Sequence, residues 1–433
     1  MIASKAQHTP MQEKVRVLQR KLYLSAKEQP KKKYGILYDK LHRWDILKLA
    51  WKQVRMNKGS AGIDNQSVDY IVDFIGVDPF LQEIQQELRD KVYRPKPVKR
   101  VYISKENRKK RPLGIPVIKD RIVQTAVKIV MEPIFEADFH ECSYGFRPKR
   151  NQHQAIRKVR RHIVTGHRYI IDLDLKSYFD TIPHENLIAL VRERVTDPWV
   201  IRLIRRWLKA GVIENDVFQT SEKGSPQGGV ISPLLANIYL NAFDQFWHKK
   251  GLDQGKHQAK LVRFADDSVI CCRHNPKRYL TAVRQIMRRL GLTINEDKTS
   301  VIHAKEGFDF LGFHFRYKKS RTGKFWCYMW PSQRSMKRIR KRVKQALRID
   351  IRTPISELAS IINPILKGWC NYYRWSNAAV HFIQMDRYVQ ERITRLLRRK
   401  RQKRGNAHRD YRTHFFRGIG IFFLSGNVKR LPF

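Results

Sequence analysis

Two clusters of aspartate stand out in this chain. Asp266 and Asp267 are adjacent and lie between the apolar pairs Phe264-Ala265 and Val269-Ile270, as on a turn between two buried strands. Adjacent carboxylates repel each other unless a positive charge lies beside them. A divalent cation supplies that charge, and ligation by oxygen atoms alone favours Mg²⁺. The alternative is a plain Asp-Asp β-turn, in which aspartate bonds its own backbone.

The second cluster contains Asp172 and Asp174, which would face the same side of a strand because they are two residues apart. One strand-borne aspartate beside an Asp-Asp turn can hold two Mg²⁺ ions, and such a site performs in-line nucleotidyl transfer. One ion activates a 3′-hydroxyl and the other stabilises the leaving pyrophosphate. Asp180, just ahead of Pro183, is instead interpreted as a helix N-cap or turn residue.

The composition indicates what such a site would act on. The chain has 433 residues, with 88 Lys and Arg against 39 Asp and Glu and a formal net charge of +49. Its 42% hydrophobic content argues against a disordered polycation. This charge predicts a polyanionic partner, with nucleic acid ahead of an anionic membrane surface.

Without an 18-residue apolar run or a signal-peptide pattern, no membrane association is expected. Five cysteines without a C-x-x-C pair predict a reducing, cytoplasmic location.

The elements that position the aspartates follow from periodicity. Residues 168–180 begin as a strand, and residues 261–272 have the pattern strand, turn, strand. Helical patterns flank both, which predicts an α+β domain with a small sheet. From about residue 331 the pattern becomes that of basic, amphipathic helices, which predicts a cationic helical C-terminal domain.

The ordered series of motifs resembles a known family. Five segments resemble the palm motifs of reverse transcriptases: DLKSYFD, SPQGGVISPLLANIYL, RFADDSVI, GLTINEDKT and FLGFHF. Upstream segments resemble the finger motifs of bacterial group II intron reverse transcriptases: NKGSAGIDNQSV, RPLGIPVIKDRIVQTAV and CSYGFRPKRN. Downstream, ILKGWCNYYRWS resembles the maturase or thumb region of the same proteins. The resemblance covers about residues 40 to 400.

The resemblance implies a right-hand polymerase, with α+β fingers and palm followed by an α-helical thumb or maturase domain. The expected boundaries are a basic helical N-terminal extension at 1–60, fingers and palm at 61–318, the helical thumb at 331–400, and a basic tail at 401–433. The tail is a candidate for a reduced DNA-binding segment. Because no Cys follows Cys370 and His408 and His414 are isolated, we expect no HNH endonuclease.

The catalytic roles carry over residue by residue. Asp174, Asp266 and Asp267 match the catalytic and metal-binding aspartates, which hold two Mg²⁺ ions. Asp172 is either an outer carboxylate or a residue at the solvent edge of the strand. Lys298 matches a position where lysine protonates the pyrophosphate as a general acid, and its alternative is a surface lysine in a turn.

The nucleotide-binding residues come from three motifs. The resemblance implies that Phe179 is a steric gate that excludes a 2′-hydroxyl, and its alternative is ordinary core. Gln227 is expected against the nucleotide and template, and Gly228 allows close backbone approach, although both also fit a Gly-rich turn before a helix.

Three cations are candidates for contacts from the fingers. Arg111 is expected to grip the triphosphate, with Lys109 as a rival, because a guanidinium binds two phosphate oxygens at once. The alternative for both is a solvated basic hairpin. Arg147 is expected to contact template or dNTP.

The C-terminal half supplies the nucleic-acid contacts. Phe310, Leu311 and Gly312 resemble the primer grip, a hairpin whose alternative is a buried strand. The aromatic residues of 369–375 are expected to pack the thumb rather than stack on bases. The RNA-contact candidates are the cations of the first thumb helix: Lys337, Arg338, Arg340, Lys341 and Arg342.

The resemblance therefore implies an RNA-directed DNA polymerase that copies intron RNA by target-primed reverse transcription. It also implies a maturase that binds the intron RNA and assists splicing and retrohoming. The expected partners are group II intron RNA, target DNA and dNTPs, as monomer or dimer, in a bacterial cytoplasm. The alternatives are a reverse transcriptase of another class (retron, phage-defence or CRISPR-associated) and a splicing factor without polymerase activity. All three catalytic aspartates are present, which disfavours the latter.

Overall fold

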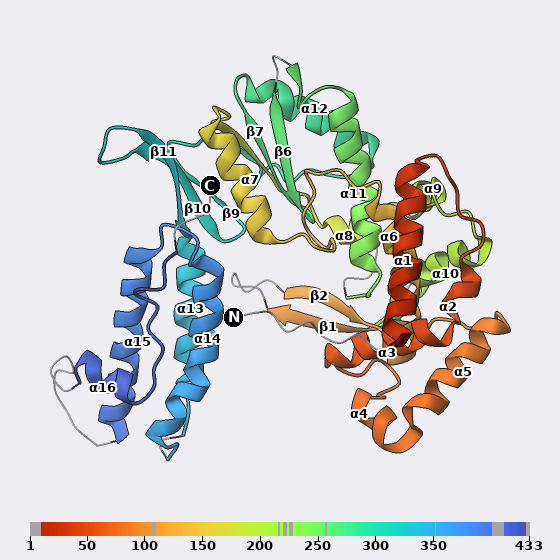
Figure 1. Cartoon of the computed structure of the whole chain (residues 1–433), viewed down its shortest axis with the longest axis horizontal. Coiled ribbons are helices and arrows are strands. Elements are labelled where there is room, and N and C mark those ends of the chain that lie inside the picture. The colour runs from red at the N-terminus through yellow and green to blue at the C-terminus, as the bar shows by residue number, and fades with distance from the viewer. Residues whose placement is uncertain are drawn as a thin grey trace. The chain divides into compact units, whose positions relative to one another are not determined.

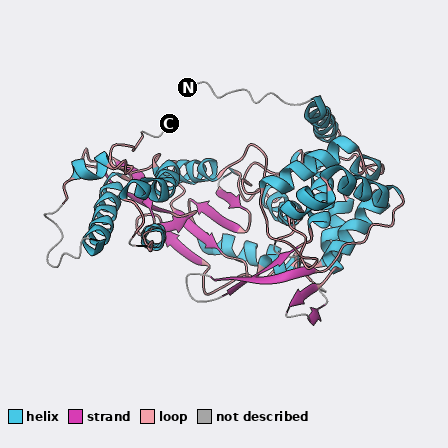
Figure 2. Ribbon diagram, turned by 90° about the horizontal axis from the view of Figure 1, so that it is seen from below, coloured by secondary structure: helices cyan, strands magenta, loops and turns pink. Residues whose placement is uncertain are grey.

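The structure is a computed structural model of the chain. It describes residues 10–104, 110–214, 217–219, 223–224, 228–255, 258–350, 352–400 and 411–429. Helices and strands are both abundant in these ranges (Figure 2), as expected for an α+β protein. None of the described helices combines the length and the apolar character that crossing a bilayer requires.

The chain divides into two compact units. Unit 1 comprises residues Met1–Ala155, Ile171–Ile270 and Asn275–Ser300, and unit 2 comprises Ile156–Ile170, Cys271–His274 and Val301–Phe433. The predicted boundaries at 60, 318, 331 and 400 remain predictions. Figure 1 labels most of the helices and several of the strands described below.

Unit 1 begins with helices and a β-hairpin. Its first elements are α1(Pro10–Glu28), α2(Tyr38–Leu41), α3(Trp44–Met56), α4(Val68–Tyr70), the π-helix η1(Ile71–Ile75), α5(Val77–Arg89), β1(Val98–Ser104), β2(Lys110–Ile115), α6(Ile118–Glu136) and α7(Gln152–Val164). Helix α7 continues into unit 2. The elements that follow are β3(Tyr169–Leu173), α8(Tyr178–Thr181), α9(His184–Arg192), α10(Pro198–Lys209), β4(Val212–Glu214), β5(Val217–Gln219), α11(Ser232–Lys249), β6(Ala259–Phe264), β7(Asp267–Cys272) and α12(Pro276–Arg289).

Unit 2 combines short strands with long helices. Its elements are most of β8(Ser300–His303), then β9(Phe308–Phe310), β10(Phe313–Lys319), β11(Phe325–Pro331), α13(Gln333–Ala346), the 3-10 helix η3(Ile355–Glu357), α14(Leu358–Tyr373), α15(Ala379–Lys400) and α16(Thr413–Gly418). The basic helices predicted after residue 331 are therefore present.

Three sheets carry the motifs. One has the strand order β2-β1-β4-β5, in which β1 and β2 form an antiparallel hairpin. The second has the order β11-β10-β9 and is antiparallel. The third has the order β6-β7-β3-β8, so the strand that follows the Asp-Asp turn is a direct neighbour of the strand that precedes Asp174. The strand predicted from residue 168 and the strand-turn-strand at 261–272 are confirmed.

The N-terminal helices belong to the core of unit 1. Helices α1 and α3 both pack on α6, whose side chains are buried on nearly every face. Gln19 of α1 donates a hydrogen bond to the Ile129 carbonyl at 3.1 Å, and Lys27 donates one to the Ala137 carbonyl at 3.3 Å. Because most side chains of α6 are buried, it requires such covering helices.

Candidate polymerase site

Asp174 lies immediately after β3 and is held by the segment that contains Lys298. Its Oδ2 accepts hydrogen bonds from Asn295 Nδ2 at 2.8 Å and from Lys298 Nζ at 3.1 Å. The backbone is joined as well, because the Asn295 N–H donates to the Asp174 carbonyl at 2.9 Å. Both side chains reach solvent, with exposed fractions of 35% for Asp174 and 66% for Lys298. The structure thus brings together two of the four predicted catalytic residues.

The donor set is compatible with Mg²⁺. Asp174 Oδ1 has no hydrogen-bond partner within the part of the chain that the structure describes, so one carboxylate oxygen is available as a ligand. Asp266 is half-buried in the turn between β6 and β7, and Asp267 is exposed at the first position of β7. Three carboxylates supply oxygen ligands only, which is the ligand type that Mg²⁺ prefers.

A buried ion pair fixes the base of the Asp-Asp turn. Arg263 on β6 donates through Nε to Asp244 Oδ1 at 3.0 Å and Oδ2 at 3.1 Å, and neither side chain has exposed surface. The same guanidinium donates through Nη1 to the Ala265 carbonyl at 3.0 Å. Ala265 itself has a φ of 59°, in the left-handed region that single turn residues adopt. Arg263 therefore anchors the turn that presents the two aspartates.

The loop of the GFRP motif lies directly against this turn. A Cβ on Gly145 would lie 2.3 Å from the Ala265 nitrogen, so only glycine fits. Asn237 on α11 donates to the Gly145 carbonyl at 2.7 Å and accepts from Arg263 Nη1 at 3.0 Å. Sequence reasoning missed this role of Gly145, Asn237 and Arg263, although each lies in or next to a recognised motif.

Gly228 brings the backbone of its loop close to β2, and the approach to the nucleotide that the sequence suggested for it stays a prediction. Its φ is +117°, and a Cβ would lie 2.3 Å from the Gly114 carbonyl oxygen on β2. Gln124 of α6 accepts a hydrogen bond from the Val230 N–H at 2.8 Å, which fixes the next turn of the loop. Gln227 and Lys109 lie outside the described residues. The backbone of Arg111 is part of β2, but its side chain is not among those that the structure describes.

Phe179 lies on the short helix α8, next to a fully anchored tyrosine. Tyr178 is buried, and its hydroxyl donates to the Ala236 carbonyl at 2.6 Å. Burial raises the pKa of Tyr178 well above its ordinary value, so the donor stays protonated. The Phe179 ring is half-buried and lies edge-on to Tyr178, with ring centroids 5.4 Å apart. Phe179 is therefore a partly accessible ring on a rigid support.

Arg147 has a full set of protein partners. Its Nη2 lies 2.7 Å from Glu136 Oε1, and its Nη1 donates to the His140 and Ser143 carbonyls at 2.6 and 2.8 Å. The side chain is 3% exposed. These contacts favour a structural role in closing the loop, and a contact with template or dNTP stays a prediction.

Asp120 lies in the first turn of α6 and contacts the segment that leads into β1. It is buried and accepts from the Tyr93 hydroxyl at 2.6 Å and from the Lys96 N–H at 3.0 Å. Burial raises the pKa of Asp120 to about 6, against the opposing effect of the Tyr93 hydrogen bond. This carboxyl ties the entry into the β1–β2 hairpin to α6, and sequence reasoning did not single it out.

In unit 2, the FLGFHF segment is a hairpin, as expected for a primer grip. Phe310 is buried at the end of β9, while Leu311 and Gly312 form the turn with φ of 48° and 80°. Two tyrosine hydroxyls hold this turn: Tyr372 donates to the Leu311 carbonyl at 2.9 Å and Tyr373 to the Gly312 carbonyl at 3.0 Å. These aromatic side chains pack in unit 2, as predicted, and their hydroxyl groups add hydrogen bonds that were not predicted.

Helix α13 separates apolar from basic side chains. Met336, Ile339 and Val343 are buried, and Arg340 is half-buried with its guanidinium 5.7 Å from the Tyr388 ring centroid. The remaining predicted RNA-contact residues are all exposed: Lys337, Arg338, Lys341 and Arg342. Together they make the exposed side of this helix basic.

Comparison with known proteins identifies the class. Residues 103–315 match the family described as "Reverse transcriptase (RNA-dependent DNA polymerase)". This range contains all four predicted catalytic residues. The chain is therefore an RNA-directed DNA polymerase by family.

A second match narrows this class. Residues 336–415 match the "Group II intron, maturase-specific domain". Protein YkfC of Escherichia coli is 38% identical over 343 residues, covering 71% of this chain and 89% of that protein. Group II intron-encoded protein LtrA of Lactococcus lactis is 30% identical over 440 residues, covering 82% and 72%. The chain belongs to the group II intron-encoded reverse transcriptases that carry a maturase domain.

Proposed function

We propose that the chain copies its intron RNA by target-primed reverse transcription and binds the same RNA as a maturase that assists splicing and retrohoming. The proposal includes the right-hand arrangement of fingers, palm and helical thumb. Its partners are intron RNA, target DNA and dNTPs. The observation that carries it is the contact of Lys298 with Asp174, which directly follows β3, the neighbour in the sheet of the strand that begins at Asp267.

The residues divide the work of nucleotide addition. Asp174, Asp266 and Asp267 would hold two Mg²⁺ ions, which when bound activate a 3′-hydroxyl and stabilise the leaving pyrophosphate. Lys298 lies within hydrogen-bond distance of Asp174, where it can deliver a proton to the leaving group. Phe179 excludes the 2′-hydroxyl of a ribonucleotide, and Gly228 lets the SPQGG loop approach β2.

Primer extension tests the polymerase. Wild type, Asp266→Ala and Asp297→Ala are given a primed RNA template, dNTPs and Mg²⁺. Asp297 is the matched control, because it is an exposed carboxylate next to Lys298 and outside the proposed metal ligands. We expect full-length cDNA from wild type and Asp297→Ala and none from Asp266→Ala. A folded wild type that binds RNA but does not extend the primer would favour a splicing factor without polymerase activity.

RNA binding tests the maturase role. The dissociation constants for the intron RNA and for an unrelated structured RNA of equal length are measured as a function of salt. We expect tighter binding of the intron RNA, and a slope of log K against log salt that falls by about one for Lys341→Ala. Lys249→Ala, an exposed lysine on α11, is the matched control. Equal affinity for both RNAs would exclude specific intron recognition.

A further inference from the structure

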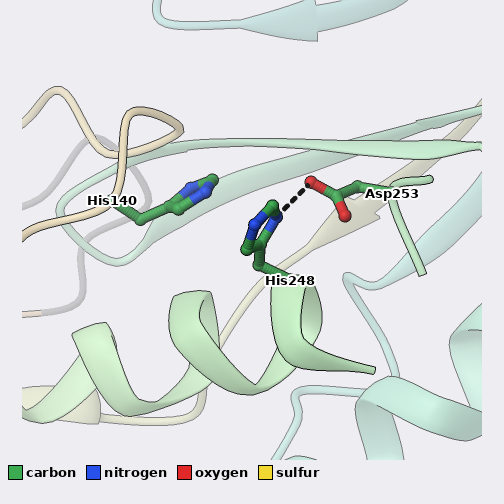
Figure 3. Close-up of side chains that lie close together, drawn as sticks. All are labelled: His140, His248 and Asp253. Atoms are coloured by element: carbon green, nitrogen blue, oxygen red, sulfur yellow. Dashed lines mark hydrogen bonds and ion pairs between the residues drawn. The ribbon is translucent and has the colours of Figure 1, made fainter. Parts of the chain in front are cut away.

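A second cluster of potential metal ligands lies in unit 1, apart from the polymerase aspartates in sequence and in donor type. His140 follows the C-terminus of α6, His248 lies in the last turn of α11, and Asp253 lies in the loop that leads to β6. In Figure 3 the His248 ring lies between the His140 ring and the Asp253 carboxylate. His140 thus meets, from more than 100 residues away along the chain, an imidazole and a carboxylate that are themselves only five residues apart.

The distances suit a small divalent ion. One ligand atom from each residue lies within 4.8 Å of the other two. His248 Nδ1 is 3.1 Å from Asp253 Oδ2, and the two imidazole centroids are 4.9 Å apart. In a tetrahedral zinc site with bonds of about 2.0–2.1 Å, neighbouring ligand atoms are roughly 3.3 Å apart. The pair of His248 Nδ1 and Asp253 Oδ2 is already close to this separation. Small side-chain rotations would bring the ligand nitrogen of His140 to a similar distance from both atoms.

The ligand atoms are available. Asp253 Oδ1 is buried and has no hydrogen-bond partner among the described residues. The hydrogen bond that His140 Nδ1 accepts from the Cys142 N–H is long, at 3.3 Å. The contacts of Gln254 Nε2 with the two His248 nitrogens are longer still, at 3.4 Å.

The end of α11 contributes a field that favours a bound cation. His248 lies at the C-terminus of α11, where the helix dipole places partial negative charge. Two buried guanidinium groups of this region are already paired: Arg147, which donates to the His140 carbonyl at 2.6 Å, with Glu136, and Arg263 with Asp244.

We propose that His140, His248 and Asp253 form a structural Zn²⁺ site, with water as the fourth ligand. Two imidazole nitrogens and a carboxylate with an open position are a donor set that zinc accepts. The ion would tie the loop of residues 137–147 to the end of α11. This loop contains Gly145, which lies against the Ala265 turn, so the site would brace the loop that packs on the catalytic turn.

Metal binding by the full-length chain tests this site. Protein freed of metal with a chelator is titrated with Zn²⁺ in competition with a chromophoric chelator, and with Co²⁺, whose visible absorption reports tetrahedral nitrogen and oxygen ligation. Thermal unfolding is followed with and without Zn²⁺. We expect one equivalent of Zn²⁺, and a midpoint that rises by several degrees.

Four variants decide between sites. His248→Ala and Asp253→Asn should weaken Zn²⁺ binding at least about tenfold and abolish the rise in the midpoint. Asp253→Asn keeps an acceptor for His248, so it also tests the site should His248→Ala fail to fold. His274→Ala, an exposed histidine outside the cluster, and Asp266→Ala should bind as wild type does. Equal binding by wild type and Asp253→Asn, or loss of the ion in Asp266→Ala alone, would overturn the proposal.

Discussion

Arg263 and Asp244 form an ion pair that is completely removed from solvent, beneath the turn that presents Asp266 and Asp267. Removing one partner of such a pair leaves a buried charge without compensation, which costs about 3–5 kcal/mol. We therefore expect Arg263→Met to lower the free energy of unfolding by about this amount, measured by urea denaturation.

The double variant Arg263→Met with Asp244→Leu is the control for this prediction. Because it removes both charges, it should recover part of the lost stability. A single variant as stable as wild type would show that the pair does not support the turn.

Lys298 is expected to act in the chemical step. Its Nζ contacts Asp174 Oδ2, so Lys298→Ala removes both a proton donor and a charge at the catalytic carboxylate. We expect single-turnover nucleotide addition to slow about 100-fold with little change in primer binding. Lys298→Arg keeps the charge and should recover little of the rate. A change confined to the KM for dNTP would contradict a role as general acid.

Phe179 is expected to set the choice of sugar. Because its ring is half-buried beside the anchored Tyr178, Phe179→Ala opens space without removing the support. We expect the ratio of kcat/KM for rNTP over dNTP to rise by about tenfold or more, which corresponds to roughly 1–3 kcal/mol of lost steric discrimination. An unchanged ratio would assign Phe179 to the core.

Gly228 and Gly251 separate the effect of crowding from that of backbone strain. Both have positive φ, but a Cβ on Gly228 would clash with the Gly114 carbonyl, whereas nothing lies within 4 Å of one on Gly251. Gly251→Ala should cost about 1–2 kcal/mol of stability. Gly228→Ala should cost more and abolish primer extension, since the SPQGG loop must move away from β2. Equal effects on thermal stability would rule out the close approach.

The pH dependence of stability should report on Asp120. Its pKa in the folded chain is raised to about 6 from 3.8, so its contribution is fully present below pH 3.8 and is lost as the pH rises through 6. Between these limits, the free energy of unfolding of wild type minus that of Asp120→Asn should fall with pH, by about 3 kcal/mol. A difference that rises with pH would mean that the Tyr93 hydrogen bond outweighs burial.

The sequence predicted those parts of the fold that have a local pattern. Strand β3, the β6–β7 pair and helix α13 follow from alternation or amphipathic spacing, and the motif order predicted the family. Contacts between distant residues were not predictable in this way. Periodicity carries no information on which carboxylate meets Arg147, or that His140 and His248 lie together. A glycine such as Gly145 shows that space is tight there, but not what fills it.

The order of strands in the third sheet has a consequence for synthesis on the ribosome. Strand β3 and Asp174 emerge first, but the neighbours β7 and β8, and Lys298, come about 100 residues later or more. A nascent chain therefore exposes an incomplete strand edge for much of its translation, and long-range pairing of this kind folds slowly. Truncated products that end before residue 298 would lack the catalytic contact while retaining the N-terminal helices. Premature termination should thus yield inactive fragments that are prone to aggregation through β3.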